Sequence, residues 1–271
     1  MAGIPGNTDS TRVRHVSLFG FRFDSVTLSE AVTKVLQLVE DPGSGYGHYV
    51  VTPNLDHSVL LYQRPELAEV YQSAELVIAD GFPVIWASRW LRKPLPERVA
   101  GSDLVPGIFQ ATTRPLRVFL LGARPGVAQL AATKVEAQYT NVRVVGVHSP
   151  ELGFEHDPAL NDEAVRLVAE TAPDVLVVAL GAPKQELWSY RERHRLRAKV
   201  IICAGATVDF LAGERKRAPA WCQRMHLEWA YRALEEPGRL IPRYATDAVM
   251  FPRLVARELV EEYRKKSRSG R

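Results

Sequence analysis

The chain has 271 residues, of which 46% are hydrophobic and 24% are charged, and its formal net charge is +4. This balance is typical of a soluble globular protein and excludes an intrinsically disordered chain. No apolar run predicts a signal peptide or a transmembrane helix, and two cysteines without C-x-x-C spacing predict no disulfide framework, so we expect a cytoplasmic protein.

The charge is unevenly distributed along the chain. Residues 214–271 contain 14 Lys and Arg against 8 Asp and Glu, whereas residues 1–213 contain 21 against 23. A basic tail on a slightly acidic body indicates an anionic partner, which is either membrane phosphate or nucleic acid. A well-solvated set of Arg-rich helices explains the same charge equally well.

The predicted elements begin with an alternating segment and an amphipathic helix. Residues 16–26 alternate apolar and polar positions, which predicts a short antiparallel strand or hairpin, and residues 27–40 have helical spacing. Strand-and-loop segments then alternate with helices. The strand-and-loop segments are 48–54, 75–81, 116–126, 142–150, 174–184 and 198–213, and the helical ones are 56–74, 82–91, 127–139, 158–172 and 185–196. This order predicts an α/β fold with a doubly wound, mostly parallel sheet and helices on both faces.

After residue 213 the sequence becomes helical, basic and aromatic. We expect residues 1–213 to form the core and residues 214–271 to form a C-terminal appendage of two or three helices, divided by Pro237, Pro242 and Pro252. A stripe of Trp221, Met225 and Trp229 has helical spacing. It would pack on the core, on lipid, or on a second copy in a homo-oligomer.

Three predicted strand ends are followed by glycine and then proline. The glycines are Gly81, Gly122 and Gly181. Glycine permits a tight turn and proline suits the first turn of the next helix, whose free N–H groups favour an anion such as phosphate. Ordinary strand-to-helix turns use the same residues. Three such ends together favour a ligand the size of a nucleotide.

Several familiar sites are missing from the sequence. There is no G-x-G-x-x-G fingerprint, which argues against an oxidoreductase, and there is no P-loop, zinc-spaced His/Cys cluster or G-x-S-x-G elbow. The absence of an Asp-x-Asp pair predicts that no metal holds a diphosphate. Cationic side chains near strand ends would neutralise it instead, and the candidates are Arg98, Arg124 and Lys184.

Five segments together resemble the WecG/TagA/CpsF glycosyltransferase family. They are "TPNLDHSVLL", "AELVIADGFPVIWASRWLRKPLPERVAGSDLVP", "VFLLGARPGVA", "LVVALGAPKQELW" and "GATVDFLAGERKRAPAWCQRMHLEWAYRALEEPGRLIPRY". The resemblance runs in order from about residue 15 to about residue 255. It implies a Rossmann-like core, and an appendage that completes the active site at the inner face of the cell membrane.

The implied activity is inverting, metal-independent sugar transfer in cell-envelope or exopolysaccharide synthesis. The donor is a UDP-sugar, so no cofactor is needed, and the acceptor is a polyprenyl-diphosphate-linked saccharide. The sugar is of the N-acetylmannosamine or glucose type. No nucleic acid is expected to bind.

The resemblance also implies roles for residues of the core. Asp80, at the end of an apolar run, matches the proposed catalytic base, which takes the proton of the acceptor hydroxyl. Thr52 and Asn54 would orient the sugar or the base, and Arg98 would face the diphosphate leaving group. We interpret Lys184, Gln185 and Asp209 as nucleotide or sugar ligands, and Glu186 as a helix cap; a structural turn explains Asp209 equally well.

In the appendage, four arginines are candidate ligands of the lipid or nucleoside diphosphate: Arg217, Arg232, Arg239 and Arg243. The chain departs from the family where it has Gly238 and Pro242, so the sequence does not identify which arginine contacts phosphate. The competing hypothesis is a non-catalytic nucleotide-sugar-binding or nucleic-acid-binding protein. A catalytic base is not needed for binding alone, which favours the enzyme.

Overall fold

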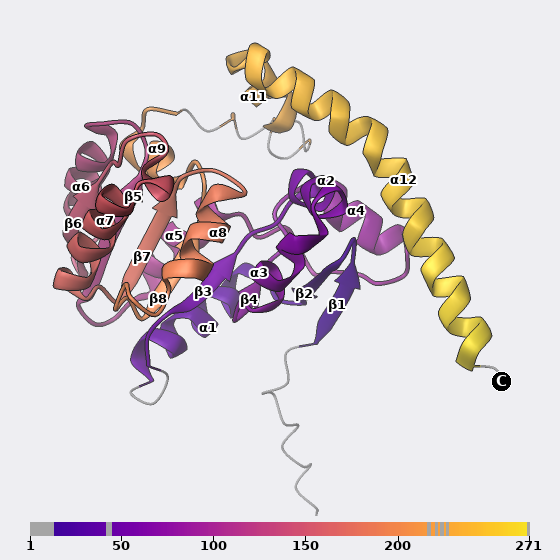
Figure 1. Cartoon of the computed structure of the whole chain (residues 1–271), viewed down its shortest axis with the longest axis horizontal. Helices are drawn as coiled ribbons and strands as arrows, with labels where there is room; N and C mark the ends of the chain where they lie inside the picture. Colours follow the sequence, from indigo (N-terminus) through magenta and orange to yellow (C-terminus); the bar gives the residue numbers. More distant parts are fainter. Residues whose placement is uncertain are drawn as a thin grey trace, which may run out of the picture.

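Six parallel strands form the central sheet of the computed structural model, in the spatial order β4-β3-β8-β7-β5-β6 (Figure 1). The structure describes residues 14–41, 45–215 and 228–269, together with residues 218, 219, 222 and 225. The strands are β3 (His48–Val51), β4 (Leu76–Val77), β5 (Leu116–Gly122), β6 (Val142–His148), β7 (Val175–Ala179) and β8 (Val200–Cys203). The predicted α/β class with a parallel sheet is confirmed.

The strand register brings the carboxyl ends of four strands to one level. Val51 lies opposite Val77 on one side and opposite Cys203 on the other, and Cys203 lies opposite Val178. The residues that follow these strands therefore meet at one edge of the sheet, which is where open α/β sheets bind their ligands.

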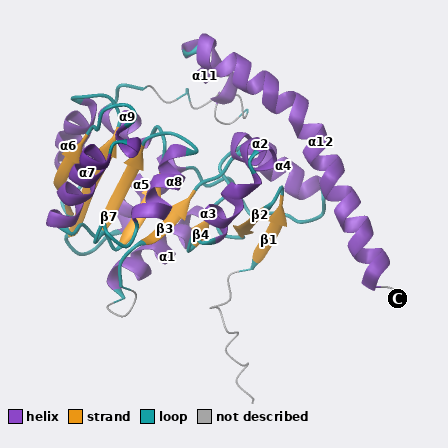
Figure 2. Cartoon of the chain, viewed as in Figure 1, coloured by secondary structure: helices purple, strands orange, loops and turns teal. Residues whose placement is uncertain are grey.

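Helices cover both faces of the sheet because neighbouring residues of each strand point to opposite sides (Figure 2). On one face Val50, Val177 and Ile202 are buried against helices. These helices are α1 (Leu28–Glu40), α5 (Gly101–Ala111), α6 (Val127–Gln138) and α9 (Thr207–Ala212). The sheet is thus doubly wound, as predicted.

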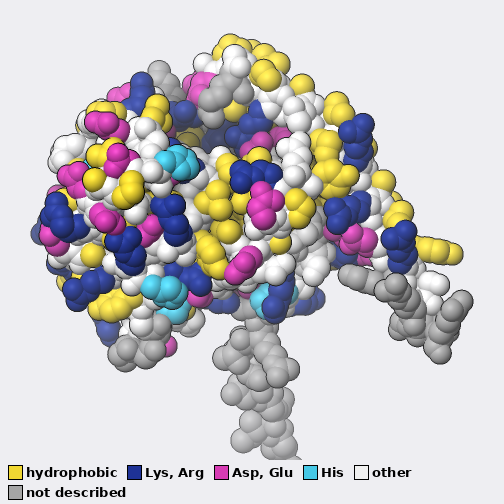
Figure 3. Space-filling model, in the orientation of Figure 1, with side chains coloured by type: hydrophobic (Ala, Val, Ile, Leu, Met, Phe, Trp, Pro, Cys, Tyr) yellow, Lys and Arg dark blue, Asp and Glu magenta, His cyan; other side chains and the backbone are white. Residues whose placement is uncertain are grey.

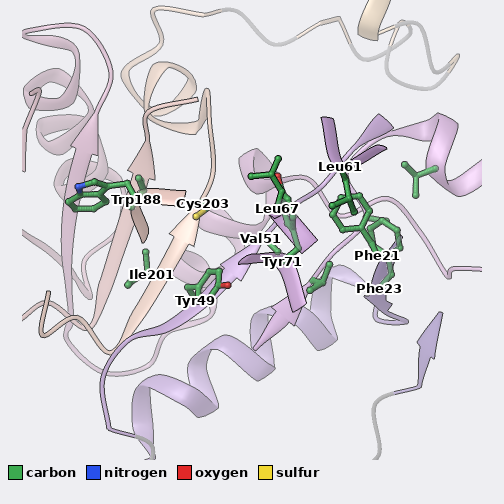
Figure 4. Close-up of a cluster of buried hydrophobic side chains, with 14 of the residues drawn as sticks. Phe21, Phe23, Tyr49, Val51, Leu61, Leu67, Tyr71, Trp188, Ile201 and Cys203 are labelled. Carbon is green, nitrogen blue, oxygen red and sulfur yellow. The ribbon is translucent and has the colours of Figure 1, made fainter. Parts of the chain in front are cut away.

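The opposite face is covered by more elements and is rich in aromatic side chains. Tyr49, Val51 and Ile201 point to this side, and Trp188 and Tyr71 pack in the same cluster (Figure 4). Its helices are α2 (Leu55–Gln63), η1 (Pro65–Leu67), α3 (Ala68–Gln72), α4 (Phe82–Trp90), η2 (Phe154–His156), α7 (Pro158–Thr171) and α8 (Lys184–Glu192). Together the two faces hold the strand ends rigidly beneath the loops that follow them.

An antiparallel hairpin, β1 (His15–Leu18) and β2 (Phe21–Asp24), packs beside the short edge strand β4. The hairpin agrees with the prediction from residues 16–26. Asp24 is buried, and its carboxylate accepts a hydrogen bond from the Val77 N–H at 2.8 Å. At the other edge of the sheet, a Glu136 carboxylate oxygen accepts a hydrogen bond from the Val144 N–H of β6 at 3.1 Å.

The C-terminal part contains α11 (Glu228–Glu235) and α12 (Pro237–Ser269), which runs diagonally past the core (Figure 1). The predicted division at Pro242 and Pro252 is wrong, because both prolines lie inside one 33-residue helix. Each interior proline costs about 3 kcal/mol. Buried Leu240, Met250 and Leu254 offset this cost, since each contributes roughly 1.5–3 kcal/mol. The expected boundary between residues 213 and 214 stays a prediction.

Two further expectations differ from the structure. The helix predicted over 56–74 is divided into α2, η1 and α3, because Pro65 follows Arg64, which has a non-helical backbone (φ −133°, ψ 76°). The helix α5 was not predicted, since it begins at Gly101 and contains Pro106. Tertiary burial of its apolar face stabilises it despite these residues.

Candidate functional site

Asp80 lies directly beyond the edge strand β4, beside the loop that follows β3. The Asp80 N–H donates to the Pro53 carbonyl at 3.0 Å, which continues the parallel pairing past the last paired residues of β3 and β4. Gly81 follows with φ +120°, and a methyl group there would lie 3.5 Å from Asn54 Cβ. The sheet therefore brings Asp80 beside the Thr52–Asn54 segment.

The Asp80 carboxylate forms an ion pair with Arg98. Arg98 Nη1 lies 3.3 Å from Asp80 Oδ1, and Arg98 Nη2 lies 3.0 Å from Asp103 Oδ2. The guanidinium also stacks over the Phe82 ring, 5.4 Å from its centroid. The Val99 N–H donates to the Ala79 carbonyl at 2.9 Å, which holds the Arg98 segment against the Asp80 strand end. The result is a half-buried carboxylate with a cation fixed beside it.

Thr52 and Asn54 lie at the end of β3 with their side chains already engaged. The Thr52 hydroxyl donates to the Cys203 carbonyl of β8 at 3.3 Å. Asn54 is the N-cap of α2, and its Oδ1 accepts the His57 N–H at 3.3 Å. Both side chains are thus held in place by the ends of the elements that surround them.

Gln185 lies on the first turn of α8 but is buried beneath the loops. Its Oε1 accepts the N–H groups of Gly181 at 3.2 Å and Gly205 at 3.1 Å, so one side chain joins the loops after β7 and β8. The interpretation of Glu186 as a helix cap is wrong. The N-cap of α8 is Pro183, which makes no side-chain cap hydrogen bond, and Glu186 is buried and bonds to His57 and Gln185 instead.

Two other predicted ligands, Lys184 and Asp209, make ion pairs of their own. Lys184 Nζ lies 3.7 Å from a carboxylate oxygen of Glu155, and Asp209 Oδ2 lies 3.5 Å from Arg215 Nε. Burial raises the pKa of Asp209, and Arg215 and then Arg124 act in the opposite direction. The structure thus pairs these two side chains with Glu155 and Arg215.

Gly122 is the last residue of β5 and lies at a different opening. Next to it is a cavity of about 330 Å³, lined by Arg124, Pro125, Gly126, Val127, Leu130 and Glu214. Arg124 there is exposed and lies 3.5 Å from a Glu214 carboxylate oxygen. This opening is separate from the Asp80 group, although both lie beyond the carboxyl ends of strands.

The appendage arginines are placed differently from one another. Arg217 and the Arg239 side chain lie outside the described residues, as does Trp221 of the predicted stripe. Arg232 stacks over the Phe210 ring of α9, 5.1 Å from its centroid. Arg243 Nη2 lies 3.0 Å from Asp56 Oδ2 on the first turn of α2. Arg243 thus contacts Asp56, which lies two residues after Asn54 in the sequence.

Asp247, one turn after Arg243, is a buried carboxylate at this contact between α12 and α2. Burial raises the pKa of Asp247 to about 6, Asp56 adds to the effect, and Arg243 opposes it. A carboxyl whose pKa is raised on folding stabilises the fold below its unfolded pKa and loses that contribution as the pH rises through about 6.

We therefore expect Asp247→Asn to raise the free energy of unfolding at pH 8 by about 1 kcal/mol. This value allows for the screening of the charge by nearby solvent. Urea unfolding from pH 4 to pH 8 measures this. The gap between variant and wild type should open between pH 4 and pH 6. A constant gap across that window would contradict the assignment.

Sequence reasoning missed two members of this group, His57 and Asp103. His57 stands three residues after Asn54, which is the spacing of a capping box, and its imidazole reaches back to the Asn54 N–H at 3.3 Å. Asp103 stands five residues after Arg98, and only the start of α5 at Gly101 turns its carboxylate toward the guanidinium. The capping-box spacing could have identified His57 from the sequence. No sequence pattern indicates the contact of Asp103 with Arg98.

Within the described ranges, no three His, Cys, Asp or Glu side chains are grouped so that they could hold a metal ion. Among the helices that the structure describes, none is both long enough and apolar enough to cross a membrane. Metal independence and membrane association remain expectations to be tested.

Comparison with known proteins assigns the family. The chain matches the glycosyl transferase WecG/TagA/CpsF family from residue 16 to residue 265. It is 32% identical over 217 residues to the N-acetylglucosaminyldiphosphoundecaprenol N-acetyl-beta-D-mannosaminyltransferase of Bacillus spizizenii, covering 78% of this chain and 82% of the relative. The proteins of the same name are 31% identical in Bacillus subtilis (73% and 78% covered) and 29% identical in Staphylococcus aureus strain MRSA252 (83% and 86% covered). The chain belongs to the WecG/TagA/CpsF glycosyltransferase family, as its sequence motifs indicated.

Proposed function

We propose that the protein transfers N-acetylmannosamine from a UDP-sugar to a polyprenyl-diphosphate-linked N-acetylglucosamine, with inversion and without a metal ion. The observation that carries the proposal is the Asp80 carboxylate, held at the edge of the sheet with Arg98 3.3 Å away. The names of the relatives support the sugar and the acceptor. From an α-linked donor, the β linkage in those names requires inversion.

Asp80 is the proposed general base. The acceptor hydroxyl oxygen attacks the anomeric carbon of the donor on the face opposite UDP, and its proton passes to the Asp80 carboxylate. One base is sufficient for a single inverting displacement, in which the new C–O bond forms as the bond to UDP breaks. Such a base contributes about 10²–10⁴-fold to the rate.

Arg98 is proposed to stabilise the departing diphosphate. The electron pair of the broken bond leaves with the β-phosphate of UDP, where negative charge increases in the transition state. A guanidinium anchored by Asp103 and Phe82 supplies a cation for that charge. Thr52 and Asn54, at the neighbouring strand end, are proposed to orient the sugar.

A membrane surface is the proposed location, because the acceptor carries a polyprenyl chain. Apolar side chains exposed along α12 support this, and they are Ile241, Val249, Leu259, Val260 and Tyr263. Basic side chains lie on the same helix, and Figure 3 shows hydrophobic and Lys or Arg side chains along its outer edge. Each Lys or Arg near an anionic surface contributes about 1 kcal/mol to binding.

The experiment that tests the function is UDP release in the presence of EDTA. A panel of UDP-sugars is incubated with a short-chain lipid-diphosphate-GlcNAc acceptor. We expect acceptor-dependent UDP release from UDP-N-acetylmannosamine that EDTA does not reduce. Release that requires added divalent metal would refute the metal-independent mechanism. UDP binding without transfer to any acceptor would favour the non-catalytic nucleotide-sugar-binding protein.

A further inference from the structure

A buried polar chain lies beneath the candidate site and is not used by the proposed chemistry. Glu186 is 1% exposed, Gln185 is 3% exposed and His57 is 6% exposed. Burying such polar groups is unfavourable unless each finds a partner. Three buried polar side chains in contact with one another therefore indicate a structural role.

The chain of contacts joins α2 to α8. His57 Nδ1 accepts the Asn54 N–H at 3.3 Å, and His57 Nε2 lies 3.4 Å from Glu186 Oε1. The same Glu186 oxygen accepts a hydrogen bond from Gln185 Nε2 at 2.8 Å. Since a carboxylate oxygen can only accept, the His57 Nε2 that faces it carries the hydrogen. Glu186 thus holds one donor from each helix.

The effect of Glu186 on Gln185 is to fix which way its amide points. A glutamine amide has a donor end and an acceptor end that are nearly equal in shape. With Nε2 held by the carboxylate, Oε1 must face the Gly181 and Gly205 N–H groups, which it accepts at 3.2 and 3.1 Å. A charge-assisted bond is the stronger kind, so the carboxylate sets the orientation.

The same chain reaches the loop after β3 through Asn54. His57 Nδ1 accepts the Asn54 N–H at 3.3 Å. Thr52, two residues before, is bonded to Cys203 of β8, the strand that leads into Gly205. The loops after β3, β7 and β8 are therefore joined by one set of buried side chains.

We propose that Glu186 and His57 are positioning residues for the transferase reaction, acting through Gln185 and Asn54 to hold the loops after β3, β7 and β8 in one arrangement. The proposal rests on the proposed function, but its structural part does not depend on it. Glu186 and His57 touch no reacting atom themselves. A displacement of about 1 Å in a reacting group can lower a rate about 100-fold, so loops held from below matter for turnover.

The first test measures amide hydrogen exchange at Gly181 and Gly205, which needs no activity. Glu186→Ala should increase the exchange rates of both amides at least tenfold. The matched control is Glu192→Ala, at the far end of the same helix, where Glu192 is 3% exposed and pairs with Arg191 and Arg195. The control should lower the melting temperature without raising exchange at the two glycines. Unchanged exchange in Glu186→Ala would overturn the proposal.

The second test uses transfer kinetics. Glu186→Ala should lower kcat about 10–100-fold with a smaller change in the donor KM. Glu186→Gln keeps an acceptor oxygen and should recover most of the lost kcat. This variant replaces Glu186→Ala in the test if the alanine variant does not fold. His57→Gln should lower kcat in the same direction. Glu192→Ala should keep kcat near that of wild type.

A double-mutant cycle shows whether Glu186 acts through Gln185. If it does, the pair Glu186→Ala and Gln185→Ala should lose no more kcat than Gln185→Ala alone. Multiplying losses would show that the two act independently and would overturn the proposal. If wild type transfers no sugar at all, the proposed function fails, and hydrogen exchange still decides the positioning role.

Discussion

Asp80→Asn is expected to lower kcat for sugar transfer by about 10²–10⁴-fold and to leave UDP binding close to that of wild type. Asparagine has nearly the same shape as aspartate but cannot accept the acceptor proton in the transition state. Acceptor-dependent UDP release measures kcat, and calorimetric titration with UDP measures binding. The combination separates a lost base from a lost ligand.

Asp103→Asn is the matched control for this substitution. Asp103 pairs with the same guanidinium at 3.0 Å, and its side chain is 20% exposed against 28% for Asp80. Removing its charge should disturb Arg98 and reduce kcat about tenfold at most, because no proton is transferred to it. Equal losses in the two variants would show that Asp80 acts only as a partner of Arg98. Loss of UDP binding in Asp80→Asn would make Asp80 structural.

Gly122→Ala is expected to destabilise the fold by about 3 kcal/mol or more. Gly122 has φ +107°, and a Cβ atom there would lie 2.4 Å from the Ala179 carbonyl oxygen of the neighbouring strand. The atoms it would meet are backbone atoms of Ala179, so no flexible side chain can move aside. Urea unfolding followed by circular dichroism measures the change in the free energy of unfolding.

Gly126→Ala provides a control within the same loop. Gly126 also has a positive φ, +82°, but no atom lies within 4 Å of the position its Cβ would take. It should lose only the conformational term of about 1–2 kcal/mol. If Gly122→Ala were no more destabilising than Gly126→Ala, the close approach of β5 and β7 at this point would not be the constraint that requires glycine.

The order of strands and helices could be predicted from the sequence because a sheet buried on both faces requires continuous apolar strands. Continuous apolar runs such as residues 175–178 read as parallel strands, and the amphipathic 27–40 segment reads as a helix, which the capping box of Thr27 and Glu30 completes. Asp80 could be placed at a strand end for the same reason. That Asp80 and Arg98 lie 3.3 Å apart needed the fold, since 17 residues separate them in the sequence.

Other features could not be predicted because tertiary contacts outweigh local preference. Proline usually ends a helix, yet α12 continues through Pro242 and Pro252 because its buried face packs on the core. Glu186 stands where a first-turn acid normally caps its own helix. Only the packing of α8 against α2 turns its carboxylate inward to His57.

The two edge strands of the sheet each have a backbone N–H occupied by a carboxylate, Asp24 at β4 and Glu136 at β6. An unpaired strand edge is a template on which another chain can add a strand, and charged side chains at the edge are a common protection against it. The edge strand that precedes the candidate base is thus shielded from intermolecular pairing by a buried side chain of a separate hairpin. The first effect of losing the Asp24 carboxylate should therefore be concentration-dependent aggregation. The proposed catalytic residues would all still be present.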